Sequence, residues 1–254
     1  MKIRWHVALV AAGLAVAAGA AAATRAPVPA GSIATILPPA PGVKVANVAA
    51  FSMDRVPVSN GDYARFVAAH PEWRRDRAPR VFADGGYLQH WASATSPAPG
   101  TAQQPVTRVS WFAASAYCEA QGARLPRWYE WERVSAADRT RADARSDPAW
   151  RQRILDWYAR PAGGPLPDVG RGEPNYFGIR DVHGLVWEWV EDLGSMMVSG
   201  DNREQGDPDL KKFCGSGALS LEQKDNYAML MRIATLSSMQ ASYTSTTMGF
   251  RCAK

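Results

Sequence analysis

The chain has 254 residues, three cysteines and a formal net charge of +5. Hydrophobic residues make up 46% of it, which suits one globular domain with a sizeable core. Lys2 and Arg4 supply part of the charge, so the rest is only mildly basic, and no nucleic-acid-binding motif is present. We therefore expect no nucleic-acid partner. Arginines at 74, 75, 77 and 80 form one cluster, which we interpret as a solvated surface, with a phosphate-binding patch as the alternative.

The first residues have the layout of a secretory signal peptide. Two basic residues precede an Ala/Val/Leu run at 7–23, and small residues offer cleavage sites after Ala20 or Ala23. The alternative is an uncleaved anchor, because the run is just long enough to span a bilayer. We expect residues 1–23 to be a signal peptide. The mature protein would then be periplasmic or secreted, with no membrane span after signal removal.

Residues 24–50 are rich in Pro, Ala and Gly and predict a flexible lead-in to a domain at 51–254. The domain begins with an expected strand at 51–58. Ser59 follows as a helix N-cap, with Asp62 at the capping-box position. The apolar stripe after Asp62 predicts a short helix that ends near residue 70.

A short strand is expected at 105–109, and two helices follow it. Ser110 caps the first of these helices, and Gly122 ends it. The second helix follows Pro126 and has apolar residues spaced three apart. Arg127 stands where a capping side chain is expected, so the cap has to come from another residue.

The segment at 138–168 is polar and rich in arginine, with a short helix expected at about 150–158. A second charged loop is expected at 202–212. Helices and short strands alternate without a repeating strand–helix–strand unit. This order predicts an α+β domain that is long on loops.

Three motifs carry a family resemblance: VSWFAASAYCEAQGARLP at 109–126, PNYFGIRDVHGLVWEW at 174–189 and GFRC at 249–252. On these motifs the chain closely resembles the formylglycine-generating, sulfatase-modifying factor family, from about residue 51 to the C-terminus. The resemblance implies the compact, loop-rich mixed fold of that family, which is related to C-type lectin domains.

Three cysteines in an exported protein allow at most one internal disulfide, and the sequence alone permits three pairings. The resemblance implies the pair Cys118–Cys252, since both residues match paired cysteines of the family. The alternative is two buried free thiols. Cys214 is then left over as a buried small hydrophobe, a metal ligand or a reactive thiolate with a catalytic role.

Formylglycine-generating enzymes oxidise a substrate cysteine with O2 and bind Cu(I) through two cysteines five positions apart. Two soft thiolates select Cu(I). A gapless alignment back from the terminal GFRC motif puts Gln223 and Ala228 at these positions. Neither residue can supply a thiolate. No cysteine pair therefore supports a copper site, and the standard conversion of cysteine to formylglycine is not expected.

The resemblance also implies a calcium site within the second motif. Its ligands would be the side chains of Asp181 and Glu188 and the backbone carbonyls of Gly184 and Val186. Oxygen ligands of this kind suit Ca²⁺. Leu185 stands where the family usually has asparagine. The alternative is that Glu188 accepts hydrogen bonds from backbone amides without any ion.

His183 lies beside this loop. It is either a plain hydrogen-bonding residue or, together with Cys214, a copper ligand. Trp187 and Trp189 alternate around Glu188 and are expected to point to opposite faces of an extended segment. Both either pack in the core or line a substrate cleft.

The resemblance implies an oxidoreductase role, namely oxidative maturation of a protein or small-molecule substrate in the periplasm, or accessory support for such a step. The alternative is a non-catalytic binding module on the same fold, for example one that assists a copper-dependent periplasmic enzyme. An enzyme needs a cleft lined by polar or redox-capable groups into which Cys214 opens. A binding module would present a shallow aromatic surface and bury Cys214.

Overall fold

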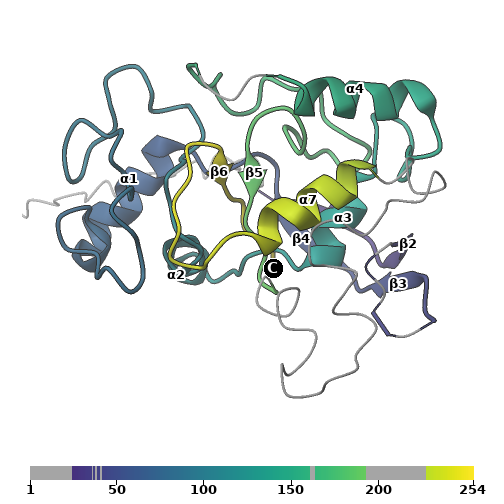
Figure 1. Cartoon of the computed structure of the whole chain (residues 1–254), viewed down its shortest axis with the longest axis horizontal. Helices are drawn as coiled ribbons and strands as arrows, with labels where there is room; N and C mark the ends of the chain where they lie inside the picture. Colours follow the sequence, from purple (N-terminus) through teal and green to yellow (C-terminus); the bar gives the residue numbers. More distant parts are fainter. Residues whose placement is uncertain (1–24, 36, 38, 41, 161–163, 193–226) are drawn as a thin grey trace, which may run out of the picture.

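The computed structural model describes residues 25–35, 37, 39–40, 42–160, 164–192 and 227–254. Short strands and helices are mixed along the chain, so the α+β class predicted from the sequence is confirmed. Figure 1 shows β5 (Trp187–Glu188) and β6 (Met248–Gly249) in the middle of the molecule. Helices α1 and α2 lie on one side of them, and α3, α4 and α7 lie on the other. Within the described ranges, no helix is long and apolar enough to cross a membrane.

Two antiparallel strand pairs form near the N-terminus, where a flexible lead-in was expected at 24–50. Strand β1 (Arg25–Val28) pairs with β4 (Phe51–Asp54), and β2 (Gly31–Ala34) pairs with β3 (Val45–Val48). Alternate side chains of β1 to β3 are buried in the core, namely Ala26, Val28, Ile33, Ala46 and Val48. The prediction missed these strands because the buried residues that alternate along them are small or β-branched. The Pro- and Gly-rich composition of the segment hid this two-residue period.

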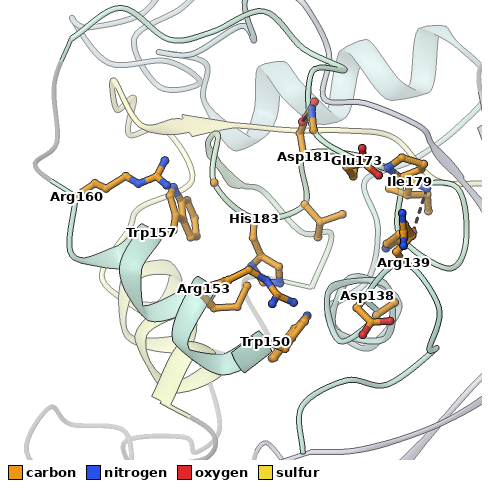
Figure 2. Close-up of a pocket in the computed structure, with 17 residues that line it drawn as sticks. Asp138, Arg139, Trp150, Arg153, Trp157, Arg160, Glu173, Ile179, Asp181 and His183 are labelled. Carbon is orange, nitrogen blue, oxygen red and sulfur yellow. Dashed lines mark hydrogen bonds between the residues drawn. The ribbon is translucent and has the colours of Figure 1, made fainter. Parts of the chain in front are cut away.

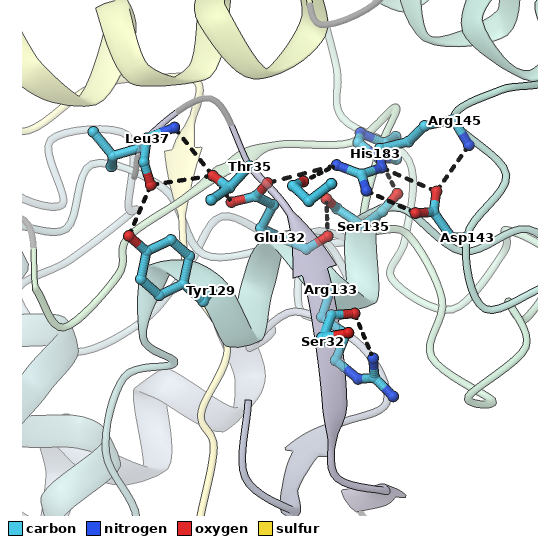
Figure 3. Close-up of polar contacts among 11 residues, drawn as sticks. Ser32, Thr35, Leu37, Tyr129, Glu132, Arg133, Ser135, Asp143, Arg145 and His183 are labelled. Atoms are coloured by element: carbon cyan, nitrogen blue, oxygen red, sulfur yellow. Dashed lines mark hydrogen bonds and ion pairs between the residues drawn. The ribbon is translucent and has the colours of Figure 1, made fainter. Parts of the chain in front are cut away.

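The N-terminal strands are tied to helix α3 (Trp128–Ser135), as Figure 3 shows. Thr35 Oγ1 donates a hydrogen bond to Glu132 Oε2 at 3.1 Å. The Tyr129 hydroxyl donates to the Leu37 carbonyl at 2.8 Å. The segment around β2 and β3 therefore belongs to the folded domain.

Strand β4 ends at Asp54, earlier than the strand expected at 51–58. Within the described residues, its ladder with β1 ends at the pair of Arg25 and Asp54. Helix α1 (Asn60–Ala69) begins as predicted, with the Ser59 side chain accepting a hydrogen bond from the Asp62 backbone N–H and the Asp62 side chain completing a capping box. A single 3₁₀ turn, η1 (Pro71–Trp73), follows α1.

The strand expected at 105–109 is reduced to one isolated bridge between Ser59 and Pro105. Arg108 has a φ of 53°, in the left-handed region, and a residue in this conformation cannot continue a strand. Helix α2 (Trp111–Ala120) is capped by Ser110, which accepts a hydrogen bond from the Ala113 backbone N–H. This cap is the one predicted from the sequence.

Helix α3 lacks a capping side chain at Arg127, as its sequence predicted. Asp192 supplies the cap instead, because its Oδ1 accepts a hydrogen bond from Trp128 N at 2.8 Å. Glu130 Oε2 accepts one from Arg127 N, also at 2.8 Å. Asp192 thus satisfies a first-turn amide from a distant part of the chain, while Glu130, at the third helical position, bonds the amide of the N-cap residue as in a capping box.

The C-terminal segment closes the core. A disulfide joins Cys118 in α2 to Cys252, and both cysteines are buried. Beside it, β5 and β6 pair in parallel, with Glu188 opposite Gly249. Two further helices, α4 (Pro148–Tyr158) and α7 (Tyr227–Ser237), contact each other and cover the region next to this pair.

Candidate functional site

A buried ion pair lies at the centre of the PNYFGIRDVHGLVWEW motif. Glu188 and Arg251 both have fully buried side chains, and Arg251 Nη2 lies 2.7 Å from Glu188 Oε1. Arg251 Nε donates to Glu188 Oε2 at 2.9 Å, and Trp131 Nε1 donates to the same oxygen at 2.8 Å. A buried carboxylate is stable only with such partners, because removing them leaves an uncompensated charge.

Arg232 in α7 brings a second buried guanidinium to this pair. Its Nη2 donates to the backbone carbonyl of Glu188 at 2.8 Å, and its guanidinium carbon lies 3.4 Å from the centre of the Trp131 ring. Burial lowers the pKa of Arg232 to about 10. Glu188 thus contacts two arginines, one through its side chain and one through its backbone.

Asp181 holds a loop rather than the centre of this network. Its Oδ1 accepts a hydrogen bond from Gly172 N at 2.9 Å, and its Oδ2 accepts one from Gly170 N. A Cβ atom at position 172 would lie 2.5 Å from Asp181 Oδ1, so the close approach requires glycine there. Asp181 itself has a φ of 56°, a left-handed conformation that aspartate tolerates better than most residues.

These contacts do not fit a calcium ion held jointly by Asp181 and Glu188. Both oxygens of Glu188 are bound by Arg251, whose positive charge takes the place that a cation would need. Both oxygens of Asp181 accept backbone N–H groups. The calcium site that the resemblance implies at Asp181, Gly184, Val186 and Glu188 is untested, and both of its carboxylates have protein partners in this structure.

A pocket of about 640 Å³ opens beside the His183 loop, between α4 and the segments that follow α3 (Figure 2). Helix α4 forms one wall. Its Asp147 cap fixes the first turn by accepting hydrogen bonds from the backbone N–H groups of Ala149 and Trp150. The other lining residues include Arg139, Glu173 and Ile179. The volume is typical of small-molecule sites.

His183 lies in this pocket and is neutral. Its Nε2 is 2.8 Å from the carbonyl oxygen of Ser135 and, because a carbonyl only accepts, this nitrogen carries the proton. Burial, together with the charges of Arg232 and Arg251, lowers the pKa of His183 to about 4, while the bond to Ser135 acts in the opposite direction. The Nδ1 atom is buried and has no hydrogen-bond partner in the described structure.

Three tryptophan rings enclose the imidazole of His183. Trp131, Trp150 and Trp157 lie with ring centres 5.8, 5.9 and 6.2 Å from it, all in edge contact. Trp187 packs against Trp157 at 5.4 Å on the same side, whereas Trp189 is fully buried and donates its indole N–H to the Val109 carbonyl. The two tryptophans therefore differ in environment, as the alternation around Glu188 predicted.

The other candidate residues are distributed as follows. Cys118 and Cys252 form the disulfide implied by the resemblance. Cys214 and Gln223 lie outside the described residues, and Ala228 lies in the first turn of α7. His183 makes the plain hydrogen bond that one of its two interpretations expected.

Sequence reasoning missed the α4 face of the pocket. It is formed by Trp150, Arg153, Ile154, Trp157 and Arg160. The two tryptophans and two arginines are spaced by three, four and three residues, the period of one side of a helix, and Arg160 lies just past the end of α4. The helix expected at about 150–158 is confirmed by α4, but the alternation of tryptophan and arginine at helical spacing on it was not recognised as the wall of a site.

Comparisons with known proteins agree on one family. A family profile described as "Sulfatase-modifying factor enzyme 1-like domain" matches residues 7–254. A hercynine oxygenase from Mycobacterium tuberculosis is 31% identical over 165 residues, which are 58% of this chain and 38% of that protein. A formylglycine-generating enzyme from Streptomyces coelicolor is 30% identical over 190 residues, which are 65% of this chain and 58% of that protein.

Among solved structures, one titled "Crystal Structure of CarF" superposes with a TM-score of 0.51 at 16% sequence identity. The match covers 91% of this chain and 97% of that one, and it supports the fold alone. The chain spans between 38% and 58% of the length of the two named relatives, so the activities of those whole proteins do not transfer directly.

Proposed function

Because the chain belongs to the family of the sulfatase-modifying factor enzyme 1-like domain, we propose that it acts in oxidative maturation of a protein or small-molecule substrate, or supports such a step as an accessory protein. The relatives named hercynine oxygenase and formylglycine-generating enzyme support an oxidative role. The proposed setting is the periplasm or the cell exterior.

The identity of two residues carries the specific part of this proposal. Gln223 and Ala228 stand at the positions where a copper-binding thiolate pair is expected. Cys118 and Cys252 are joined to each other and cannot replace that pair. Cys214 is the one cysteine left for redox chemistry, and one thiolate does not make the two-thiolate Cu(I) site. The reaction is therefore not the standard conversion of cysteine to formylglycine.

Two observations support export. The N-terminal 23 residues have the composition of a signal peptide. The Cys118–Cys252 disulfide suits an oxidising compartment, since cytosolic thiols are kept reduced. Calcium at the Asp181 loop is not part of the proposal, because the oxygens of Asp181 and Glu188 already have other partners.

The first test is mass spectrometry of a Cys-x-Pro-x-Arg peptide incubated with the protein, Cu(I), O2 and a reductant. The Streptomyces formylglycine-generating enzyme serves as the positive control. We expect an aldehyde product with the control enzyme and none above background with this chain. An aldehyde formed by this chain would contradict the proposal and assign Cys214 to the standard reaction.

The second test asks whether any oxidation depends on the chain. Exported proteins and metabolites are compared by mass spectrometry between a strain that lacks the chain and one that carries it. We expect an oxidised species that disappears with the gene and returns with the wild-type protein. If no species changes, the oxidative role is wrong.

A non-catalytic binding module is the second candidate, and the pocket beside His183 favours it. Tryptophan, arginine and histidine side chains are prominent in its lining, and no cysteine of the part of the chain that the structure describes is among them. Complementation with Cys214→Ser separates the two candidates. A redox enzyme that uses this thiol should lose the oxidised product, whereas a binding module should restore it as the wild type does.

A further inference from the structure

We propose that the pocket between α4 and the His183 loop binds a small anionic molecule with a flat aromatic body, the anionic group being a carboxylate or a phosphate. This inference concerns binding and does not depend on the oxidation proposed above. Binding can be measured without turnover, so either proposal can fail while the other stands.

The α4 wall supplies the positive charge. Arg153 and Arg160 lie on the pocket side of this wall and are exposed to solvent. Neither side chain has a hydrogen bond, an ion pair or a ring contact within the described structure. Arg153 lies within α4 and Arg160 directly follows the C-cap at Ala159, so the two side chains meet the pocket at different points and both can reach one ligand. Figure 2 shows both arginines on the same side of the pocket as Trp157.

The acidic side chains of the pocket are mostly occupied. Asp138 accepts hydrogen bonds from the Arg141 side chain and from the backbone N–H groups of Thr140 and Arg141. Asp181 accepts two backbone N–H groups. Glu173 lies at the end of the pocket away from Arg153 and Arg160 in Figure 2. The guanidinium groups of Arg153 and Arg160 therefore remain available to an anion.

The floor of the pocket is apolar and uncharged. Trp150, Ile154, Ile179 and Val182 are buried there. His183 adds an imidazole whose Nε2 donates to the Ser135 carbonyl and whose buried Nδ1 has no hydrogen-bond partner in the described structure. A flat ring placed on this floor would contact indole faces and edges, which are favourable partners for an aromatic ligand.

The arginines at the rim and the aromatic floor together determine which class of ligand fits the pocket. Aromatic walls without the arginines would accept a neutral or a cationic ring, since a cation is attracted to indole faces. Guanidinium groups at the rim favour carboxylate and phosphate, which they bind through two parallel hydrogen bonds. Charge at the rim and an apolar floor together fit an amphipathic anion oriented with its ring inward.

The test is isothermal titration calorimetry of the full chain with four probes. The probes are 2-naphthoate, 2-naphthyl phosphate, the neutral 2-naphthamide and the non-aromatic cyclohexanecarboxylate. We expect at least one naphthyl anion to bind one-to-one. We also expect it to bind at least about 10-fold more tightly than 2-naphthamide and cyclohexanecarboxylate. The tighter of the two naphthyl anions identifies the anionic group.

Two variants assign the binding to this pocket. Arg153→Gln/Arg160→Gln should weaken binding of the preferred anion by about 10-fold or more and leave 2-naphthamide unchanged. Arg77→Gln is the matched control, because Arg77 is exposed outside the pocket lining. Both arginines of the double variant are exposed, so the fold should be retained, and circular dichroism checks this.

Three results would overturn the inference. One is the absence of binding heat for both naphthyl anions at millimolar concentration. Another is equal affinity for 2-naphthoate, 2-naphthyl phosphate and 2-naphthamide. The last is an Arg153→Gln/Arg160→Gln protein that binds the preferred anion as the wild type does.

Discussion

At Glu188, one carboxylate accepts three hydrogen bonds from Arg251 and Trp131 in a fully buried position. Glu188→Gln keeps the size of the side chain but removes the charge that balances Arg251. Breaking one partner of a buried pair typically costs about 3–5 kcal/mol. We therefore expect the free energy of unfolding, measured in urea, to fall by that amount.

The double variant Glu188→Gln/Arg251→Met is the internal control, since it removes both charges. Its loss of stability should be smaller than the sum of the two single losses, because each single variant leaves one charge uncompensated. If the two losses simply add, the two side chains are not coupled and the ion pair is not the stabilising feature.

The contacts of Glu188 also lead to a prediction about calcium binding. The oxygens of Glu188 and Asp181 are bound to protein donors, so added Ca²⁺ should find no joint carboxylate site there. The melting temperature of the wild type should be equal in chelator and in millimolar Ca²⁺. If Ca²⁺ instead raises the melting temperature of the wild type, and this increase is lost in Asp181→Ala, the site that the family resemblance implies is established.

At the scale of the element, helix α3 depends on a cap from a distant residue. Asp192→Ala should destabilise the protein by about 1 kcal/mol, because Trp128 N loses its acceptor. Arg127→Thr places a capping hydroxyl in the usual position. In the Arg127→Thr background, the loss of stability caused by Asp192→Ala should be smaller. Thermal unfolding of the wild type, the two single variants and the double variant measures this difference. Equal losses in both backgrounds would contradict the role of Asp192.

Because the N-terminal strands pack on the core, substitutions in them should destabilise the protein, whereas substitutions in a flexible lead-in would not. Val28 is 1% exposed in β1, where it pairs with Phe51 of β4. Val28→Asp buries a charge without a partner and should lower the melting temperature markedly. Ser32→Asp changes an exposed position of β2 in the same way and should have little effect. If Val28→Asp leaves the melting temperature unchanged, the segment does not contribute to the stability of the fold.

What the sequence could and could not predict follows from how local each signal is. The Ser59 and Ser110 caps depend on residues a few positions apart, and both were predicted. Asp192 caps Trp128 from 64 positions away, and only the absence of a local cap was visible beforehand. The partners of Glu188 come from α3 and the C-terminus, so its ion pair could not be separated from a metal site by reading one motif.

At the scale of the whole molecule, one covalent link joins the C-terminal segment to helix α2 in the middle of the chain. The Cys118–Cys252 disulfide closes a segment of 134 residues, which stabilises the fold by roughly 4–5 kcal/mol in the chain-entropy model. Asp54 N donates to the carbonyl of Cys252, so the β1–β4 pair is attached to the same point. The disulfide therefore secures the N-terminal strands as well as α2.

Glu132 and His183, both close to α3, have pKa values shifted in opposite directions, so their contributions to stability change with pH in opposite directions. Burial raises the pKa of Glu132 from 4.5 to about 7, although the Thr35 hydroxyl and the charge of Arg145 act against this. The folded state then holds the extra proton between these values, so stability falls as pH rises from about 4.5 to 7. His183 has its pKa lowered from 6.5 to about 4, so its contribution rises with pH over nearly the same range.

Single variants should separate these two contributions. Relative to wild type, Glu132→Gln should gain stability as pH rises from 4.5 to 7, by up to about 3 kcal/mol. His183→Gln should gain as pH falls from 6.5 to 4, because no buried group then has to remain unprotonated. Urea unfolding at several pH values measures both differences, and Glu119→Gln, at an exposed position, is the control. The interpretation fails if neither difference changes with pH, since the two groups would then titrate alike in the folded and unfolded chain.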